Sequence, residues 1–303
     1  MKFALMFTNT GMGSTAAGAR QMAQTAEKAG FESLWTVEHV VVPSGYGSAY
    51  PYHPSGKMAG GMEEFDLPDP LIWLAFVAAA TERIRLATGI LIVPQRNPLV
   101  LAKEVATLDA LSGGRVTLGV GVGWLEEEFN ALGVPFADRG RRLDDYVEAM
   151  RALWQGGKAS VHNTYASFDE CISLPRPAAG TVPIVIGGHS RAAARRAARL
   201  GDGFFPGNGK VDELAEVYGT FVAACVEVGR DPSEVELSAG GGGRSFDDIA
   251  TRVEQLVALG VSRVILSPSR AARRAAARLC PPITIGTVPA AGRGRLMHSS
   301  NDA

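Results

Sequence analysis

Three stretches of the sequence place residues that could do chemistry at the end of an apolar run. Glu38 and His39 follow residues 34–37, and a histidine so placed can form hydrogen bonds or move a proton near neutral pH. Gly89 lies inside a second run, where a glycine permits a bulge or the close approach of a ligand. Residues 187–190 follow a third run and combine two glycines with a helix start, which is an arrangement that binds phosphate. The chemistry expected is proton transfer beside a bound, phosphorylated ligand.

Each of these sites has a plainer interpretation. His39 would then be a structural residue bonded to a loop carbonyl, Gly89 would relieve crowding in a barrel layer, and Ser190 would only cap a helix. Residues 240–243, which are four consecutive glycines, are a rival phosphate site or a flexible loop. Spacing alone does not separate these alternatives.

A further glycine-rich run spans residues 119–123 and precedes Trp124. It could let the backbone face a flat ligand, but it lacks the last glycine and the later acidic residue of a dinucleotide fingerprint. Three glutamates follow at positions 126–128. We expect them to form the exposed start of a helix, where the helix dipole favours negative charge.

Eight apolar runs that read as strands alternate with helical patterns along the chain. Such alternation predicts a parallel sheet, and eight units favour a closed TIM (β/α)8 barrel over an open doubly wound sheet. The expected strands are residues 2–7, 31–36, 84–93, 116–120, 184–186, 203–206, 235–238 and 264–266. The expected helices are residues 15–29, 70–80, 98–111, 139–155, 190–200, 211–228, 246–259 and 270–279.

Two irregular segments interrupt the repeat, at about residues 40–68 and 156–183. The first is rich in Pro, Gly and Tyr, and a loop of that length in a compact domain is usually functional or disordered, so we expect a lid or substrate wall. Residues 156–183 carry strand-like fragments near Ser160 and Tyr165. The domain prediction is one barrel over residues 1–280 with these two insertions, and a frayed tail over residues 281–303.

Composition excludes several classes of protein. The formal net charge is −1, which offers no global field for nucleic acid or an anionic membrane. The longest apolar run, residues 71–80, is half a membrane span; it is apolar enough for a homodimer contact, or else packs on the barrel. Three separated cysteines and five scattered histidines favour neither a disulfide framework nor a metal site. A cytoplasmic location is expected.

Taken in order, these motifs resemble the luciferase-like family of flavin and deazaflavin enzymes, whose members are (β/α)8 barrels with insertions. The resemblance covers roughly residues 1–268 and is most specific over residues 112–124. It is closest to the branch that uses coenzyme F-420, a 5-deazaflavin. The segments that carry it are residues 33–39, 88–90, 94–98, 106–115, 118–124, 139–146 and 186–188.

The resemblance implies roles for individual residues. His39 would lie beside the ring or the reacting carbon as proton donor or orienting group, and the 89–90 peptide would be cis and bulge against the ring. The implied catalytic residues are His39, Glu38 and Trp124. The implied cofactor-binding residues are His39, Thr88, Gly89, Ile90, Gly121, Gly123, Gly187, Gly188, His189 and Ser190.

The function expected is hydride transfer between F-420 and a small organic substrate. An FMN-dependent monooxygenase of the same family is the first alternative, and a catalytically silent flavin-binding protein is the second. The chain departs from related sugar-phosphate dehydrogenases at Pro43, where they carry Trp, and at Trp124, where they carry an acid. Their acid–base pair and their substrate are therefore not carried over.

Overall fold

A computed structural model describes residues 1–243 and 245–268, and these residues form a closed barrel of parallel strands. The ring runs β3-β2-β1-β11-β10-β9-β8-β5 and is closed by the pairing of β3 with β5, for example Leu86 with Val116. The TIM-barrel prediction is confirmed. Its strands are β1 (Lys2–Leu5), β2 (Ser33–Thr36), β3 (Arg85–Thr88) continued by β4 (Leu91–Ile92), β5 (Val116–Gly121), β8 (Ile184–Gly187), β9 (Gly203–Phe205), β10 (Glu236–Gly240) and β11 (Arg263–Leu266).

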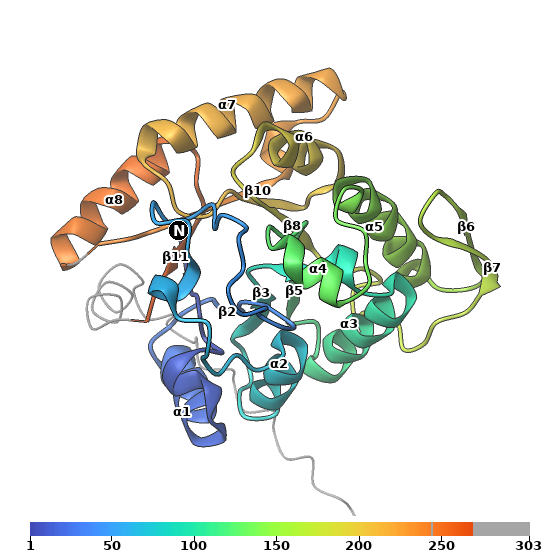
Figure 1. Ribbon diagram of the computed structural model, residues 1–303, viewed down its shortest axis with the longest axis horizontal. Helices are drawn as coiled ribbons and strands as arrows, with labels where there is room; N and C mark the ends of the chain where they lie inside the picture. Colours follow the sequence, from blue (N-terminus) through green and yellow to red (C-terminus); the bar gives the residue numbers. More distant parts are fainter. Residues whose placement is uncertain (244, 269–303) are drawn as a thin grey trace, which may run out of the picture.

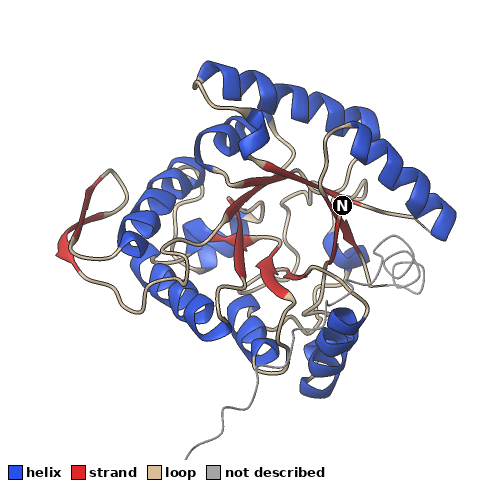
Figure 2. Cartoon of the chain, turned by 180° about the vertical axis from the view of Figure 1, so that it is seen from behind, coloured by secondary structure: helices blue, strands red, loops and turns tan. Residues whose placement is uncertain are grey.

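Helices surround the strands, as seen from both sides of the molecule (Figures 1 and 2). They bury alanine, leucine and aromatic side chains against the outer face of the barrel, which forms the main core. The α-helices are α1 (Ala16–Lys28), α2 (Pro70–Ala78), α3 (Pro98–Ser112), α4 (Glu126–Ala131), α5 (Arg139–Gln155), α6 (Arg191–Leu200), α7 (Val211–Glu227) and α8 (Phe246–Ala258). Short 3-10 turns occur at η1 (Gly11–Ser14), η2 (Met58–Gly61), η3 (Val93–Gln95) and η4 (Pro232–Glu234).

Capping residues explain why the starts of several helices could be predicted from the sequence. The Asp69 side chain accepts hydrogen bonds from the amides of Leu71 and Ile72, and Pro70 takes the first helical position. Thr15 caps α1 in the same way, by accepting from the amide of Gly18. The predicted helices over residues 98–111 and 139–155 are confirmed to within one residue.

One expectation about local structure needs correction, and another is made more specific. Residues 84–93 are not one strand, because β3 and β4 are separated at Gly89 and Ile90, whose peptide bond is cis, as the resemblance implied. In the segment 156–183, the strand-like fragments expected near Ser160 and Tyr165 correspond to β6 (Ala159–His162) and β7 (Ser167–Cys171), which form an antiparallel hairpin that projects beside α5 (Figure 1). The predicted helix 270–279 and the tail 281–303 lie outside the described residues, so the domain boundary stays a prediction.

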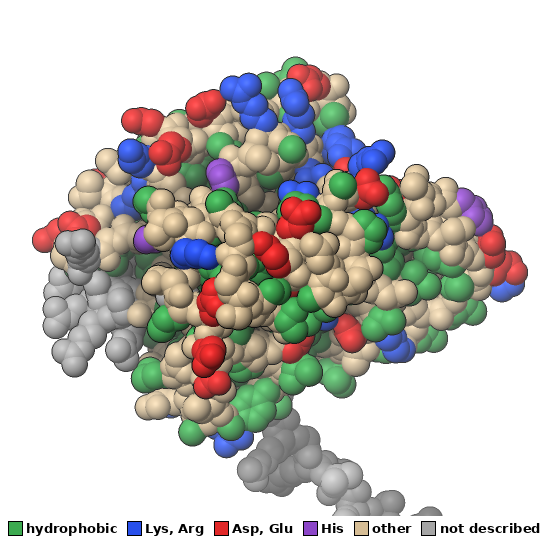
Figure 3. All heavy atoms as spheres, in the orientation of Figure 1, with side chains coloured by type: hydrophobic (Ala, Val, Ile, Leu, Met, Phe, Trp, Pro, Cys, Tyr) green, Lys and Arg blue, Asp and Glu red, His purple; other side chains and the backbone are tan. Residues whose placement is uncertain are grey.

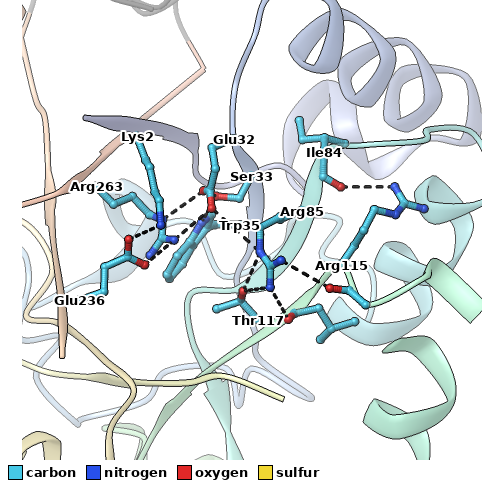
Figure 4. Close-up of polar contacts among 12 residues, drawn as sticks. Lys2, Glu32, Ser33, Trp35, Ile84, Arg85, Arg115, Thr117, Glu236 and Arg263 are labelled. Carbon is cyan, nitrogen blue, oxygen red and sulfur yellow. Dashed lines mark hydrogen bonds and ion pairs between the residues drawn. The ribbon is translucent and has the colours of Figure 1, made fainter. Parts of the chain in front are cut away.

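A cluster of charged residues lies where the strands begin (Figure 4). Arg263, only 3% exposed, pairs with Glu32 at 3.0 Å and with Glu236 at 2.6 Å. Burial acts to raise the pKa of Glu32, but the hydrogen bond and charge of Arg263 outweigh it and hold that pKa below its usual value. Lys2 of β1 also pairs with Glu236 of β10, across the intervening β11. These charges are paired with one another, and barrels of this type carry their active sites at the opposite end, where the strands finish.

Helix α2 bears on the predicted oligomer. It buries Leu71, Trp73, Leu74 and Val77 against the barrel, which accounts for most of its apolar character. Ile72 remains 74% exposed and Phe76 38% exposed, so an apolar strip is left on its outer side. A homodimer contact through α2 stays a prediction. Within residues 1–243 and 245–268, none of the helices has the length and apolar character needed to cross a membrane.

Candidate active site

A cavity of about 720 Å³ opens at the carboxyl ends of the strands. Its wall is built from the residues that directly follow β1, β2, β3, β5, β8 and β9, together with the insertion over residues 40–68. This is the end at which barrels of this type carry their active sites, and the volume suits a small-molecule site. The predicted site residues that line it are Glu38, His39, Gly89, Ile90, Gly121, Gly123, Trp124, Gly187, Gly188, His189 and Ser190.

His39 is held in one orientation by a buried glutamate. Its Nδ1 lies 2.8 Å from Oε2 of Glu128, and the His39 side chain is 10% exposed. The other oxygen of Glu128 accepts the backbone amide of Val40 at 2.6 Å. An ionised carboxylate can only accept, so Nδ1 carries the hydrogen and Nε2 is the nitrogen left for a ligand in the cavity. His39 is thus arranged to exchange a proton through Nε2.

The structure overturns the expectation that Glu126, Glu127 and Glu128 are exposed together. They do begin helix α4, but Glu128 is fully buried, and Oε1 of Glu127 accepts the amides of Gly47 and Ser48 at 2.7 and 3.1 Å. The cause is the insertion, which folds over α4, buries Glu128 and partly covers Glu127. The helix dipole argument predicted the start of α4, but it carries no information about the loop that covers this helix.

Glu38 has a different task from the one implied. Its Oε1 accepts from the guanidinium of Arg96, and its Oε2 accepts the amide of Ile92 at 2.5 Å. Burial raises the pKa of Glu38, and the charge of Arg96 acts in the opposite direction. Both oxygens are therefore committed to fixing the chain just after the bulge. Glu38 positions that bulge, and it is not arranged as a free acid or base.

Ile90 projects into the cavity between two glycines. A Cβ on Gly121 would lie 2.5 Å from Cδ1 of Ile90, and a Cβ on Gly187 would lie 2.4 Å from its Cγ2. Gly89 is similarly restricted, by the ring of Trp35 at 2.7 Å. These glycines make room for the Ile90 bulge. Thr88 does not line the cavity: its hydroxyl donates to the carbonyl of Gly119 at 2.6 Å.

Trp124 is the centre of an aromatic wall. Its ring meets that of His39 edge-on at 5.6 Å, and it also contacts Tyr46 and Tyr50 of the insertion at 5.5 and 5.2 Å. Gly123 precedes it with φ +79°, and a Cβ there would strike Phe129 at 2.7 Å. Trp124 therefore links the strand end to the insertion and restrains the ring of His39.

The loop over residues 187–190 leads into helix α6. Ser190 caps the helix by accepting the amide of Ala193 at 3.1 Å, and the amide of Gly188 is used by the carbonyl of Phe205. The first amides of a helix have no partner within it, so those of Arg191 and Ala192 remain for an anion. Figure 3 shows Lys and Arg side chains gathered around α6.

The rival glycine run over residues 240–243 does not line the cavity. The amide of Gly240 donates to Gly207 and that of Gly241 to Ile265, so two of its four amides are already committed. A Cβ on Gly240 would collide with the Asn208 side chain at 1.4 Å. Close packing explains Gly240, Gly241 and Gly243, though not Gly242, and the 187–190 loop is the better candidate for an anion site.

The insertion over residues 40–68 crosses the cavity as a wall. At one end Tyr52 packs edge-on against His189 with ring centroids 5.1 Å apart. At the other, the side chain of Asn9 donates to the carbonyls of Val37 and Pro68 at 2.8 and 2.9 Å. The sequence suggested this wall through its tyrosines. No pattern in the sequence indicated that Glu127 and Asn9 anchor this wall.

We expect Glu127→Ala to loosen the insertion. The side-chain hydrogen bond of Ser48, with the backbone bonds at Glu127 and Gly47, holds the pKa of Glu127 at about 2. The contact is therefore complete above pH 4.5 and is lost as the pH falls toward about 2. At neutral pH the variant should exchange the amide hydrogens of Gly47 and Ser48 about tenfold faster, because two hydrogen bonds are removed. The Glu126→Ala variant, which changes an exposed side chain in the same turn, should exchange them at the wild-type rate. Equal exchange in both variants would contradict the anchoring role.

Comparisons with known proteins place these features in a family. The sequence model of the luciferase-like monooxygenases matches residues 1–278. An F-420-dependent glucose-6-phosphate dehydrogenase of Beutenbergia cavernae is 36% identical over 195 residues, which are 62% of this chain and 52% of the relative. An FMNH2-dependent dimethylsulfone monooxygenase of Pseudomonas putida is 30% identical over 199 residues, 64% of this chain and 50% of the relative. The solved structure of an F-420-dependent secondary alcohol dehydrogenase has a TM-score of 0.74 at 17% identity, covering 91% of this chain and 99% of that one.

Proposed function

Because the chain belongs to the luciferase-like monooxygenase family, we propose that it is an oxidoreductase that binds coenzyme F-420 in the barrel mouth. In this proposal a hydride passes between the deazaflavin and a small organic substrate. The observation that carries the proposal is the pairing of His39 with buried Glu128 beside the Ile90 bulge, in one cavity with the 187–190 loop. The proposed location is the cytoplasm.

The residues present fit a flat ring that ends in a phosphate. Ile90 offers an apolar surface, and Gly121 and Gly187 carry no side chain that would displace it. The amides of Arg191 and Ala192 would bind the phosphate, with His189 and Ser190 beside it. When bound, the deazaflavin supplies the hydride chemistry. The protein's own part is to orient the ring, exclude water and manage the proton.

In this proposal His39 is the residue that exchanges a proton with the substrate. With its hydrogen held at Nδ1 by Glu128, neutral His39 presents the lone pair of Nε2 to the cavity and can take the proton of a substrate hydroxyl. The protonated ring presents an N–H at the same atom and can give it to a carbonyl oxygen. Buried Glu128 stabilises the positive charge that the ring then carries. The same pair of residues serves oxidation of an alcohol and reduction of a carbonyl.

An FMN-dependent monooxygenase remains the second candidate function. It is favoured by the dimethylsulfone monooxygenase among the relatives, whose printed name specifies FMNH2. FMN has a flat ring and a terminal phosphate as well, so the same cavity suits it. The two candidates differ in chemistry, because a deazaflavin does not readily activate oxygen.

Titration with oxidised F-420 and, separately, with FMN tests the proposal. We expect micromolar binding of F-420, followed by its fluorescence, and no binding of FMN. The reverse result, together with oxygen consumption by the reduced FMN complex, would assign the protein to the monooxygenases. Binding of neither would remove the cofactor assignment. Binding without turnover of any substrate would favour the catalytically silent flavin-binding protein.

A further inference from the structure

Among the described residues that line the cavity, none is a lysine or an arginine. The charged side chains in its wall are Glu38 and Asp66, both acidic, and the histidines are His39 and His189. Glu38 is neutralised by Arg96, which leaves Asp66 at the exposed rim as the uncompensated charge. An anionic substrate held away from the 187–190 loop would lose its water shell and meet a negative charge, which is unfavourable.

Three cations near lining residues are committed to contacts within the protein, whereas Arg191, which follows Ser190, is exposed and pairs with Glu216 at 3.3 Å. Nζ of Lys57 donates to the carbonyl of Tyr46 at 2.7 Å and lies over the Tyr46 ring. Arg139 donates to the carbonyl of Gly123 at 3.2 Å and stacks on Phe136. Arg96 is held by Glu38 and Asp69. None of these three could bind an anionic substrate without breaking its present contacts.

The wall between the β1 loop and the insertion is instead apolar and adaptable. Unbranched, polarisable methionine side chains can follow the shape of different apolar ligands. The residues that form this wall are Met6, Met58, Met62, Phe65 and Leu67, with the ring of Tyr50.

Polar groups in the wall are sparse and mostly neutral. The hydroxyls of Thr10 and Ser14 already donate to the carbonyls of Phe7 and Gly11, at 2.9 and 2.8 Å, so they can only accept from a ligand. Asn208 is a neutral amide, and His39 offers Nε2. Such groups suit one oxygen function on a ligand, either a carbonyl or a hydroxyl.

We propose that the substrate is an uncharged molecule with a largely apolar body that carries one carbonyl or hydroxyl oxygen, and that the methionine-rich wall selects it against anions. The inference rests on the proposed function, because it names the substrate class of the same site. The oxygen would lie at His39, and the apolar body against Met58, Met62 and Phe65.

A pair of probes that differ only in charge tests the inference. We would measure the binding of 2-nonanone and of nonanoate to the full chain by calorimetry, with and without F-420 or FMN. With the cofactor bound at the 187–190 loop, the ketone is expected to bind at least about tenfold more tightly, since nonanoate would bury an unpaired carboxylate. Equal or tighter binding of nonanoate would overturn the inference, and so would failure of the ketone to bind a protein that binds its cofactor. Ketone binding without binding of either cofactor would support the ligand class and remove the proposed reaction.

Substitution at the rim gives a second readout. Met62 is 60% exposed, so a charged side chain there should be tolerated by the fold. Met62→Arg is expected to improve nonanoate binding about threefold, as an exposed ion pair would. Met62→Gln, which adds polarity without charge, should weaken the binding of both probes slightly and leave the ketone as the tighter ligand. A preference for nonanoate in Met62→Gln would contradict selection by charge.

Discussion

Replacing His39 by alanine is expected to lower turnover by about 10²–10⁴-fold, the range for loss of a positioned acid–base group. His39 lines the cavity, and its Nδ1 is fixed by Glu128 at 2.8 Å, which leaves Nε2 for a ligand. Single-turnover oxidation or reduction of the bound cofactor would measure the change. The affinity for the cofactor should fall by much less, because the amides at the start of α6 and the Ile90 surface are untouched.

Glu128→Gln separates orientation from catalysis. The amide oxygen of the new side chain could still accept from Val40, but its NH2 group would then face Nδ1 of His39 and drive the ring hydrogen to Nε2. Nε2 would lose its lone pair in the neutral ring, so alcohol oxidation should fall by about 10–100-fold and the pH profile should change shape. A merely structural role for Glu128 would reduce stability without altering the pH profile. For the first variant, full turnover in His39→Ala would contradict an acid–base role for His39.

The barrel was predictable because its signals are local. Each strand is a short apolar run, and helices α1, α2, α3, α6 and α8 begin with a capping residue, such as Asp69 or Ser190, that acts within three positions. The break after Thr88 was not predictable from periodicity, because Leu91 and Ile92 remain as apolar as a continuous strand requires. The glycine at position 89 allowed a bulge as one of two interpretations, and only the resemblance indicated the cis peptide at Gly89–Ile90 that the structure has.

The site residues divide along the same line. His39 and the 187–190 loop could be found because they follow strands directly, and strand ends meet at one edge of a barrel. Glu128 could not, since it lies 89 positions from His39 and its burial depends on the insertion. The role of Arg96 was equally unpredictable, because its ion pair with Glu38 is visible only in the folded structure. Partnerships made through folded loops leave no spacing for sequence analysis to detect.

The second large effect is expected from Gly187→Ala. The added Cβ would lie 2.4 Å from Cγ2 of Ile90, so the bulge or the β8 backbone must shift. Overpacking of this kind costs about 1–3 kcal/mol of unfolding free energy. Because Ile90 and the neighbouring α6 amides form the proposed cofactor surface, F-420 binding should weaken by at least about tenfold. Chemical denaturation and cofactor titration of the purified variant would measure the two effects.

The double variant Gly187→Ala with Ile90→Ala identifies the cause. Without Cγ2 of Ile90, the contacts remaining around the new Cβ are the carbonyl of Val120 at 3.3 Å and Cβ of residue 90 at 3.5 Å, which need little adjustment. Relative to Ile90→Ala alone, the second change should therefore cost much less stability than it does in the wild-type background. Gly219→Ala is the matched control: a Cβ there meets nothing within 4 Å in the middle of α7, so alanine should be neutral or stabilising. Equal destabilisation of both backgrounds by Gly187→Ala would show that the collision with Ile90 is not the reason for a glycine at position 187. The glycine would then be needed for the backbone conformation of the 187–190 loop.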